Sequence, residues 1–197
     1  MPFSLVVSLF LPTFVLMTND IAHELAKLHE LRGKQFVRQL EKITLYGGFH
    51  LIKGEVAIYS VGGEHDDDFE NLMAAAHKAV EQGNQVYLLP NPKNVKTADF
   101  IFEKKGAYKM YDLKTVHGKA SIETQLLDSM EQSNRILLHM TADYNARLLA
   151  SDIKSYFEKN ADAIEVLIYK GKKVVSVNRY SALNPMFYKQ FRKRYEK

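Results

Sequence analysis

One stretch, residues 98–115, constrains the fold more than any other part of the chain. It reads ADFIFEKKGAYKMYDLKT, in which two runs of alternating apolar and polar residues flank Lys104-Lys105-Gly106. Alternation with a period of two is typical of β-strands, and a short Gly-containing link between two such runs is typical of a tight turn. We therefore predict a β-hairpin whose two-residue turn is Lys105-Gly106.

This turn fixes the register of the predicted hairpin. Each step outward from Lys105-Gly106 pairs the next two residues, so Asp99 lies opposite Asp112. Directly opposed residues have Cβ atoms about 4.5–5.5 Å apart, and like charges there are destabilising. Because side chains alternate between the two faces of a strand, Lys114 lies on the same face as both carboxylates. A divalent cation would compensate the carboxylate pair.

The pattern of Asp, then Asp-x-Lys on the next strand, then a helix resembles the PD-(D/E)XK nuclease superfamily. The resemblance covers residues 66–168 and is closest to the C-terminal tRNase domains of contact-dependent growth inhibition toxins of the CdiA type. It depends on an ordered set of segments: a helix with Glu70, a strand ending at Pro90, Lys-x-Ala-Asp-Phe at 96–100, Asp-Leu-Lys at 112–114, a helix ending at Gln132, and a strand.

The resemblance implies a fold and an activity. The fold is α/β (α+β), with a mixed central β-sheet flanked by helices and a restriction-endonuclease-like core. The activity is that of an endonuclease, a hydrolase of phosphodiester bonds in nucleic acid, with RNA, and tRNA in particular, favoured over DNA. The setting is the bacterial cytoplasm, with delivery of the toxin to another cell and an immunity protein as a partner.

The resemblance also implies site residues. Asp99, Asp112 and Glu70 are expected to hold Mg²⁺ or Mn²⁺, and Lys114 to stabilise the attacking hydroxide. Glu70 has a second interpretation, as a first-turn glutamate that complements the helix dipole. The helix before residue 136 offers two glutamines, Gln125 and Gln132. The candidate substrate-binding residues are Thr115, His117, Gln132, Lys96 and Ser121.

Composition narrows the chemistry further. The chain has no cysteine, so any metal must be held by oxygen or imidazole ligands. Basic residues concentrate at the C-terminal end, where residues 170–197 hold nine Lys or Arg and a single acid. Such a basic end is a candidate footprint for nucleic-acid phosphates, or else the solvated face of a terminal helix.

We predict three parts along the chain. Residues 1–17 are an apolar N-terminal extension or a mis-called start, and residues 18–61 form a second extension of helices and strands. Residues 62–197 form the nuclease-like domain with its basic C-terminal helix. The uncharged segment 1–16 is shorter than the ~20 residues that a spanning helix needs, and it lacks the cationic start of a signal peptide. No stable membrane insertion is expected.

Within the second extension, apolar spacing predicts helical structure over residues 20–42 with a break at Gly33. Residues 43–51 and 55–61 are predicted as strands.

Three other interpretations of the hairpin stay open. Lys114 forms surface salt bridges with Asp99 and Asp112, which contribute about 0–1 kcal/mol each. Alternatively, the protein is a metal-independent ribonuclease of the barnase-EndoU-colicin-RelE group, in which His117 is the general base. In the third interpretation the chain is a non-catalytic module of a mobile element that binds nucleic acid or a protein.

Overall fold

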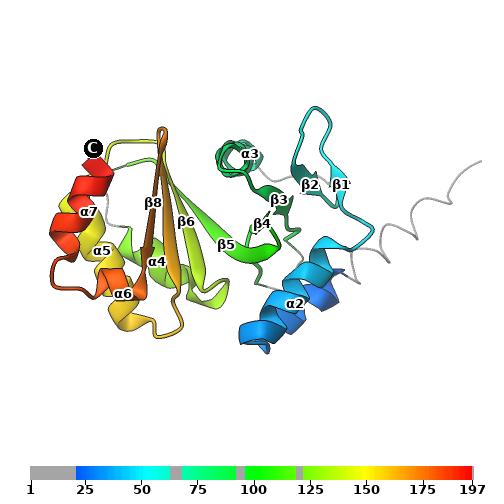
Figure 1. Ribbon diagram of the computed structural model, residues 1–197, viewed down its shortest axis with the longest axis horizontal. Coiled ribbons are helices and arrows are strands. Elements are labelled where there is room, and N and C mark those ends of the chain that lie inside the picture. Colours follow the sequence, from blue (N-terminus) through cyan, green and yellow to red (C-terminus); the bar gives the residue numbers. More distant parts are fainter. Residues whose placement is uncertain (1–20, 63–67, 92–95, 119–121, 197) are drawn as a thin grey trace, which may run out of the picture.

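The computed structural model describes residues 21–62, 68–91, 96–118 and 122–196. Its centre is an eight-stranded mixed sheet whose strands lie side by side in chain order (Figure 1). The strands are β1 (His50–Leu51), β2 (Ile58–Ser60), β3 (Gln85–Leu88), β4 (Phe100–Lys104), β5 (Ala107–Val116), β6 (Arg135–Met140), β7 (Glu165–Lys170) and β8 (Lys173–Asn178). The helices are η1 (Lys27–His29), α2 (Gly33–Thr44), α3 (Phe69–Glu81), α4 (Glu123–Asp128), η2 (Ser129–Glu131), α5 (Ala146–Lys159), α6 (Arg179–Ala182) and α7 (Phe187–Glu196). The predicted α/β fold, a mixed sheet flanked by helices, is confirmed.

The long strand β5 changes partner halfway along its length. Its first half pairs antiparallel with β4, from Lys104 against Ala107 to Phe100 against Tyr111. Its second half pairs parallel with β6, and that pairing begins at Asp112. Figure 1 shows β5 running from the group formed by β1–β4, α2 and α3 to the group formed by β6–β8 and α4–α7. The change of partner falls between Tyr111 and Asp112.

The predicted hairpin has the observed register. Lys105 and Gly106 both have positive φ, 53° and 76°, which is the signature of the two-residue turn that matches strand twist. Gly106 adopts this conformation without steric cost. Its N–H donates a hydrogen bond to the Glu103 carboxylate at 2.7 Å. The pairing of Phe100 with Tyr111 therefore follows from a turn that the sequence specifies.

One face of the sheet is covered by α3. Three small residues of this helix, Ala75, Ala76 and Ala79, are fully buried and share a hydrophobic core with Phe100 and Tyr111. Because these side chains are small, α3 can lie close to the aromatic rings of β4 and β5. Among those rings, the centroids of Phe102 and Tyr111 are 4.9 Å apart. This face thus carries the odd-numbered positions of β5.

The opposite face carries two separate cores. Around the first half of β5, Ile101 and Met110 pack against apolar residues of the segment 21–28 and of α2. Around the second half, Val116 packs with β6, β7 and β8 against α4, α5 and α7. Asp112 and Lys114 lie on this same face of β5, between Met110 in the first core and Val116 in the second.

The segment before β2 differs from its prediction. The sequence predicts helical structure over residues 20–42 with a break at Gly33. The structure has a helical segment at residues 21–26, then η1, and then α2, which begins at Gly33. The strand predicted for 43–51 is wrong over most of its length, because α2 continues to Thr44 and β1 comprises His50 and Leu51 alone. Helical spacing explains the difference, since Leu40, Ile43 and Thr44 are buried on one side of α2. β1 and β2 join the same sheet as the rest.

No helix among the described residues is both long and apolar enough to span a bilayer. The apolar segment 1–17 lies outside the described residues.

Candidate functional site

Two aspartates meet where β5 changes partner. Asp112 is 2% exposed and is the first residue of β5 to pair with β6. Asp99 stands immediately before β4, and its backbone N–H donates to Tyr111 O at 3.1 Å. Its carboxylate accepts a hydrogen bond from Leu113 N at 2.5 Å, in the second half of β5. Asp99 therefore reaches across the change of partner and lies beside Asp112.

The two carboxyl groups perturb each other. Burial, then the neighbouring charge of Asp112, raises the pKa of Asp99 to about 7, against the opposing effects of the Leu113 N–H and Lys114. Burial also raises the pKa of Asp112, although Lys114 and the Ser129 hydroxyl oppose that rise. Two carboxyls so close together, one buried and one half-buried, do not both ionise readily without a compensating cation, and otherwise share a proton. The pair of carboxyls therefore either binds a cation or holds a proton.

Lys114 supplies part of the compensation. Its Nζ lies 2.9 Å from Asp112 Oδ2, and its side chain is 24% exposed while that of Asp112 is 2% exposed. The contact has the distance of an ion pair. One ammonium beside two carboxylates leaves a net negative charge when both are ionised. The three predicted residues of the hairpin do lie together.

Ser129 joins this group and was not predicted. It is fully buried at the start of η2, its hydroxyl donates to Gln125 O at 2.9 Å, and it lowers the pKa of Asp112. The signal was present in the sequence, because Ser129 is a polar residue on the apolar side of the helix that precedes β6. Of the two glutamines of that segment, Gln125 is exposed.

Glu70 is not brought to the aspartates. It is exposed in the first turn of α3, the helix that covers the face of the sheet opposite Asp112 and Lys114. Within the described residues, no group of three or more His, Cys, Asp or Glu side chains could hold a metal ion. Glu70 therefore does not join Asp99 and Asp112 as predicted, and its position in the first turn of α3 fits its alternative role at the start of a helix.

Thr115 and His117 also lie away from the carboxylate pair. Side chains alternate along β5, so Thr115 faces the side of α3, opposite Lys114. His117 is exposed beyond the end of the strand, with Nδ1 3.0 Å from Thr141 Oγ1. Lys114 and Thr115 therefore point to opposite faces of β5, so the predicted substrate contact of Thr115 does not lie on the face where Lys114 would act on a phosphate. Ser121 lies outside the described residues.

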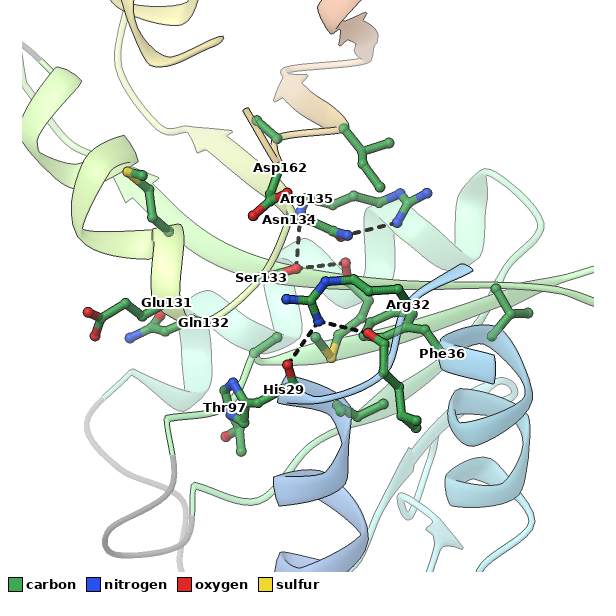
Figure 2. A pocket seen from close by; sticks show the side chains of 18 of the residues that line it. His29, Arg32, Phe36, Thr97, Glu131, Gln132, Ser133, Asn134, Arg135 and Asp162 are labelled. Carbon is green, nitrogen blue, oxygen red and sulfur yellow. Dashed lines mark hydrogen bonds between the residues drawn. The ribbon is translucent and has the colours of Figure 1, made fainter. Parts of the chain in front are cut away.

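Lys96 and Gln132 line a cleft of about 870 Å³ on the same side of the sheet as the aspartates. The cleft runs between the N-terminal helical segment, the end of η2 and the loop before β7. Figure 2 shows Arg32 lying between His29 and Thr97 on one side and Asn134 and Arg135 on the other. Lys96 forms an ion pair with Glu131 there. Two predicted substrate contacts are thus placed in one depression of the surface.

The comparisons with known proteins add no relative. No protein-family model matches the sequence, and no curated protein matches it.

Proposed function

We propose that the protein is a metal-dependent nuclease that hydrolyses phosphodiester bonds of nucleic acid at Asp99, Asp112 and Lys114. The observation that carries the proposal is a pair of neighbouring carboxyls with raised pKa values, Asp112 buried and Asp99 half-buried, with a lysine at 2.9 Å from Asp112. Strongly perturbed titratable groups with a specific charged partner are typical of functional sites. A surface salt bridge would not account for this, because Asp112 is almost fully buried.

The carboxylate pair suits a hard divalent ion. Mg²⁺ is usually bound through one or two carboxylates together with water and substrate phosphates, so Asp99 and Asp112 suffice without Glu70. Mg²⁺ or Mn²⁺ held there would polarise the phosphoryl oxygen and lower the pKa of a bound water. The remaining chemistry belongs to the side chains of the chain itself.

Each of the neighbouring residues has a role in this proposal. Lys114 places a positive charge beside Asp112, where it stabilises the attacking hydroxide or the negative charge that develops on the phosphate. Leu113 N–H orients the Asp99 carboxylate by donating to it at 2.5 Å. Ser129 favours the ionised form of Asp112, the form that binds a cation. Thr115 and Glu70 have no role here.

The element order supports the same proposal. A helix, three strands, a helix and a strand follow one another as α3, β3, β4, β5, α4 and β6. This is the order on which the resemblance to the PD-(D/E)XK nucleases depends. The finer assignments are part of the proposal and come from the resemblance: an RNA substrate, tRNA in particular, a toxin in the bacterial cytoplasm that is delivered to another cell, and an immunity protein as partner.

Cleavage assays on two substrates test the proposal. Purified protein is incubated with total tRNA and with plasmid DNA in Mg²⁺, in Mn²⁺ and in EDTA, beside the near-isosteric variant Asp112→Asn. The matched control is Asp128→Asn, which removes an exposed carboxylate at the end of α4. We expect cleavage that requires metal, is lost in Asp112→Asn and persists in Asp128→Asn.

Two other results would replace the proposal. Cleavage that survives both EDTA and Asp112→Asn would move the chemistry to His117 and the metal-independent mechanism. Salt-sensitive binding without cleavage of either substrate would identify a binding module instead.

A further inference from the structure

The cleft beside the aspartates carries more positive charge than its own acids neutralise. Arg32, Lys34 and Arg38 line it from the N-terminal helical segment. Among the described residues none of these three forms an ion pair, and Arg32 Nη1 donates to the backbone carbonyls of His29 and Leu31 at 2.8 Å. Of the two acids in the cleft, Glu131 is paired with Lys96, which leaves Asp162. The cleft therefore attracts anions.

The N-terminal end of α2 adds to the positive electrostatic potential of the cleft. α2 begins at Gly33, its N-cap residue Arg32 makes no side-chain capping hydrogen bond, and its first turn holds no acidic residue. Arg32 and Lys34 instead place cations at the positive end of the helix dipole, where an anion is the stabilising partner. An anion in the cleft would relieve this unfavourable arrangement.

Apolar side chains form another part of the lining. Leu28, Phe36, Met110 and Ile164 line the cleft together with the cations. Surfaces that combine cations with apolar and aromatic groups suit unpaired nucleotides, because the phosphate meets the charge and the base meets the apolar surface. The volume of about 870 Å³ lies within the range of small-ligand sites. A space of that size takes in single nucleotides but not a double helix.

The cleft adjoins the carboxylate pair through the chain itself. Ala98, which lines the cleft, immediately precedes Asp99, and Met110 precedes Asp112 by two positions on the same face of β5. Two residues of strand span about 7 Å. Ser133, which also lines the cleft, donates its hydroxyl to Met110 O at 3.1 Å and so helps to hold Met110 in place. Asp99 and Asp112 do not line the cleft themselves, and a strand in the cleft would reach them by extending past Ala98 and Met110.

We propose that this cleft binds unpaired nucleotides of the nucleic-acid substrate next to the bond that is cut. The inference rests on the proposed nuclease function and deepens it, since it defines the substrate as a strand that is unpaired beside the cleavage site. It also gives the N-terminal helical segment a function, as the wall that supplies the phosphate-binding cations.

Binding measured without cleavage tests the inference. A fluorescently labelled single-stranded RNA of 12 nucleotides is titrated in EDTA with wild type, Arg38→Ala, and Arg32→Ala/Arg38→Ala, and fluorescence anisotropy is recorded at several salt concentrations. We expect the double variant to bind about tenfold more weakly. In a plot of log affinity against log salt concentration, the slope for the double variant should be shallower than that of wild type by about 1.4, the value for two phosphate contacts on a single strand. Binding of a duplex of equal length should not change.

Matched variants make the result specific. Arg147→Ala removes an exposed arginine of α5 that does not line the cleft and should leave binding unchanged. Arg38 is exposed, so Arg38→Ala keeps the test valid even where the loss of the Arg32 contacts disturbs folding. Equal binding by wild type and both cleft variants, or an equal loss in Arg147→Ala, would overturn the inference.

The two proposals fail in different ways. Loss of binding in the cleft variants with no metal-dependent cleavage by wild type would keep the cleft as a binding site and remove the nuclease. Cleavage lost in Asp112→Asn but RNA binding unchanged in the cleft variants would keep the nuclease and remove this role for the cleft.

Discussion

Glu165 on β7 and Tyr111 on β5 are joined by a buried hydrogen bond of 2.9 Å, although β6 lies between their strands. The same carboxylate accepts hydrogen bonds from Lys109 Nζ at 3.0 Å and Ser176 Oγ at 2.7 Å, and Arg135 Nε lies 3.5 Å away. Lys109 and Tyr111 belong to the half of β5 that pairs with β4. Glu165 thus links that half to β7 and β8.

The first prediction concerns Glu165→Gln. Burial raises the pKa of Glu165, but the hydrogen bonds from Ser176 and Lys109 outweigh this effect and hold it below its usual value. Removing the charge from such a group should lower the free energy of unfolding by about 2–4 kcal/mol near pH 7. The midpoint of urea denaturation measures it, with Glu158→Gln on the exposed side of α5 as control, where a change within about 0.5 kcal/mol is expected.

The pH dependence of that loss has a definite sign. A carboxyl with a lowered pKa contributes stability above its unfolded pKa and loses it as pH falls through the folded value. The difference between wild type and Glu165→Gln should therefore shrink in acid. A difference that grew as pH fell would contradict the network.

The second prediction concerns Asp99→Asn. Because the pKa of Asp99 is raised to about 7, the folded state holds a proton between about pH 4 and pH 7 that the unfolded state has released. The free energy of unfolding of the metal-free protein should fall as pH rises through this window, by up to about 1.4 kcal/mol per unit. Asp99→Asn should make that slope shallower, since only Asp112 then titrates with a raised pKa, and should be more stable than wild type at pH 8. Thermal denaturation in EDTA at pH 5.5 and 8 checks this, and parallel curves would refute it.

The third prediction concerns metal. Divalent ions compete with protons for the carboxylate pair, so Mg²⁺ or Mn²⁺ should raise the melting temperature of wild type more at pH 8 than at pH 5.5. At a hundredfold excess over the dissociation constant the stabilisation is about 2.7 kcal/mol. Asp112→Asn should lose the shift, and EDTA should reverse it in wild type. A shift retained by Asp112→Asn would place the ion elsewhere.

The fourth prediction separates Lys114 from the metal ligands. Lys114→Met should lower the cleavage rate about 10²–10³-fold, because it removes a positive group aimed at charge that develops during the reaction. The metal-dependent shift in melting temperature should remain, since Asp99 and Asp112 are unchanged. Lys53→Met, in an exposed turn, is the control. Loss of the metal shift along with activity would make Lys114 a residue that organises the carboxylates.

The hairpin was predictable because its determinants are local. Lys105-Gly106 adopts the turn that its sequence favours, and the register that places Asp99 beside Asp112 follows from that turn. Lys114 followed from strand alternation alone. The fold class was likewise readable from the order of periodic segments.

The remaining parts of the site depend on long-range packing. Which face α3 covers is decided by its alanines against the rings of β4 and β5, and this choice takes Glu70 away from the aspartates. Ser129 reaches Asp112 only because α4 and η2 cross the other face. The cleft needs three segments distant in sequence, and the change of partner in β5 is set by where β6 begins. Nothing local encodes these arrangements.

The change of partner in β5 has a mechanical consequence. The backbone of Asp99 is attached to the half of the sheet that contains β4, whereas Asp112 belongs to the half that contains β6. Among the described strands, β5 alone is hydrogen-bonded to both β4 and β6. The twist of β5 between Tyr111 and Asp112 therefore acts on the separation of the two carboxylates, together with the hydrogen bond from Leu113 N–H to Asp99 and the link that Glu165 makes between the two halves. Substitutions far from the aspartates that alter this twist will move one carboxylate relative to the other.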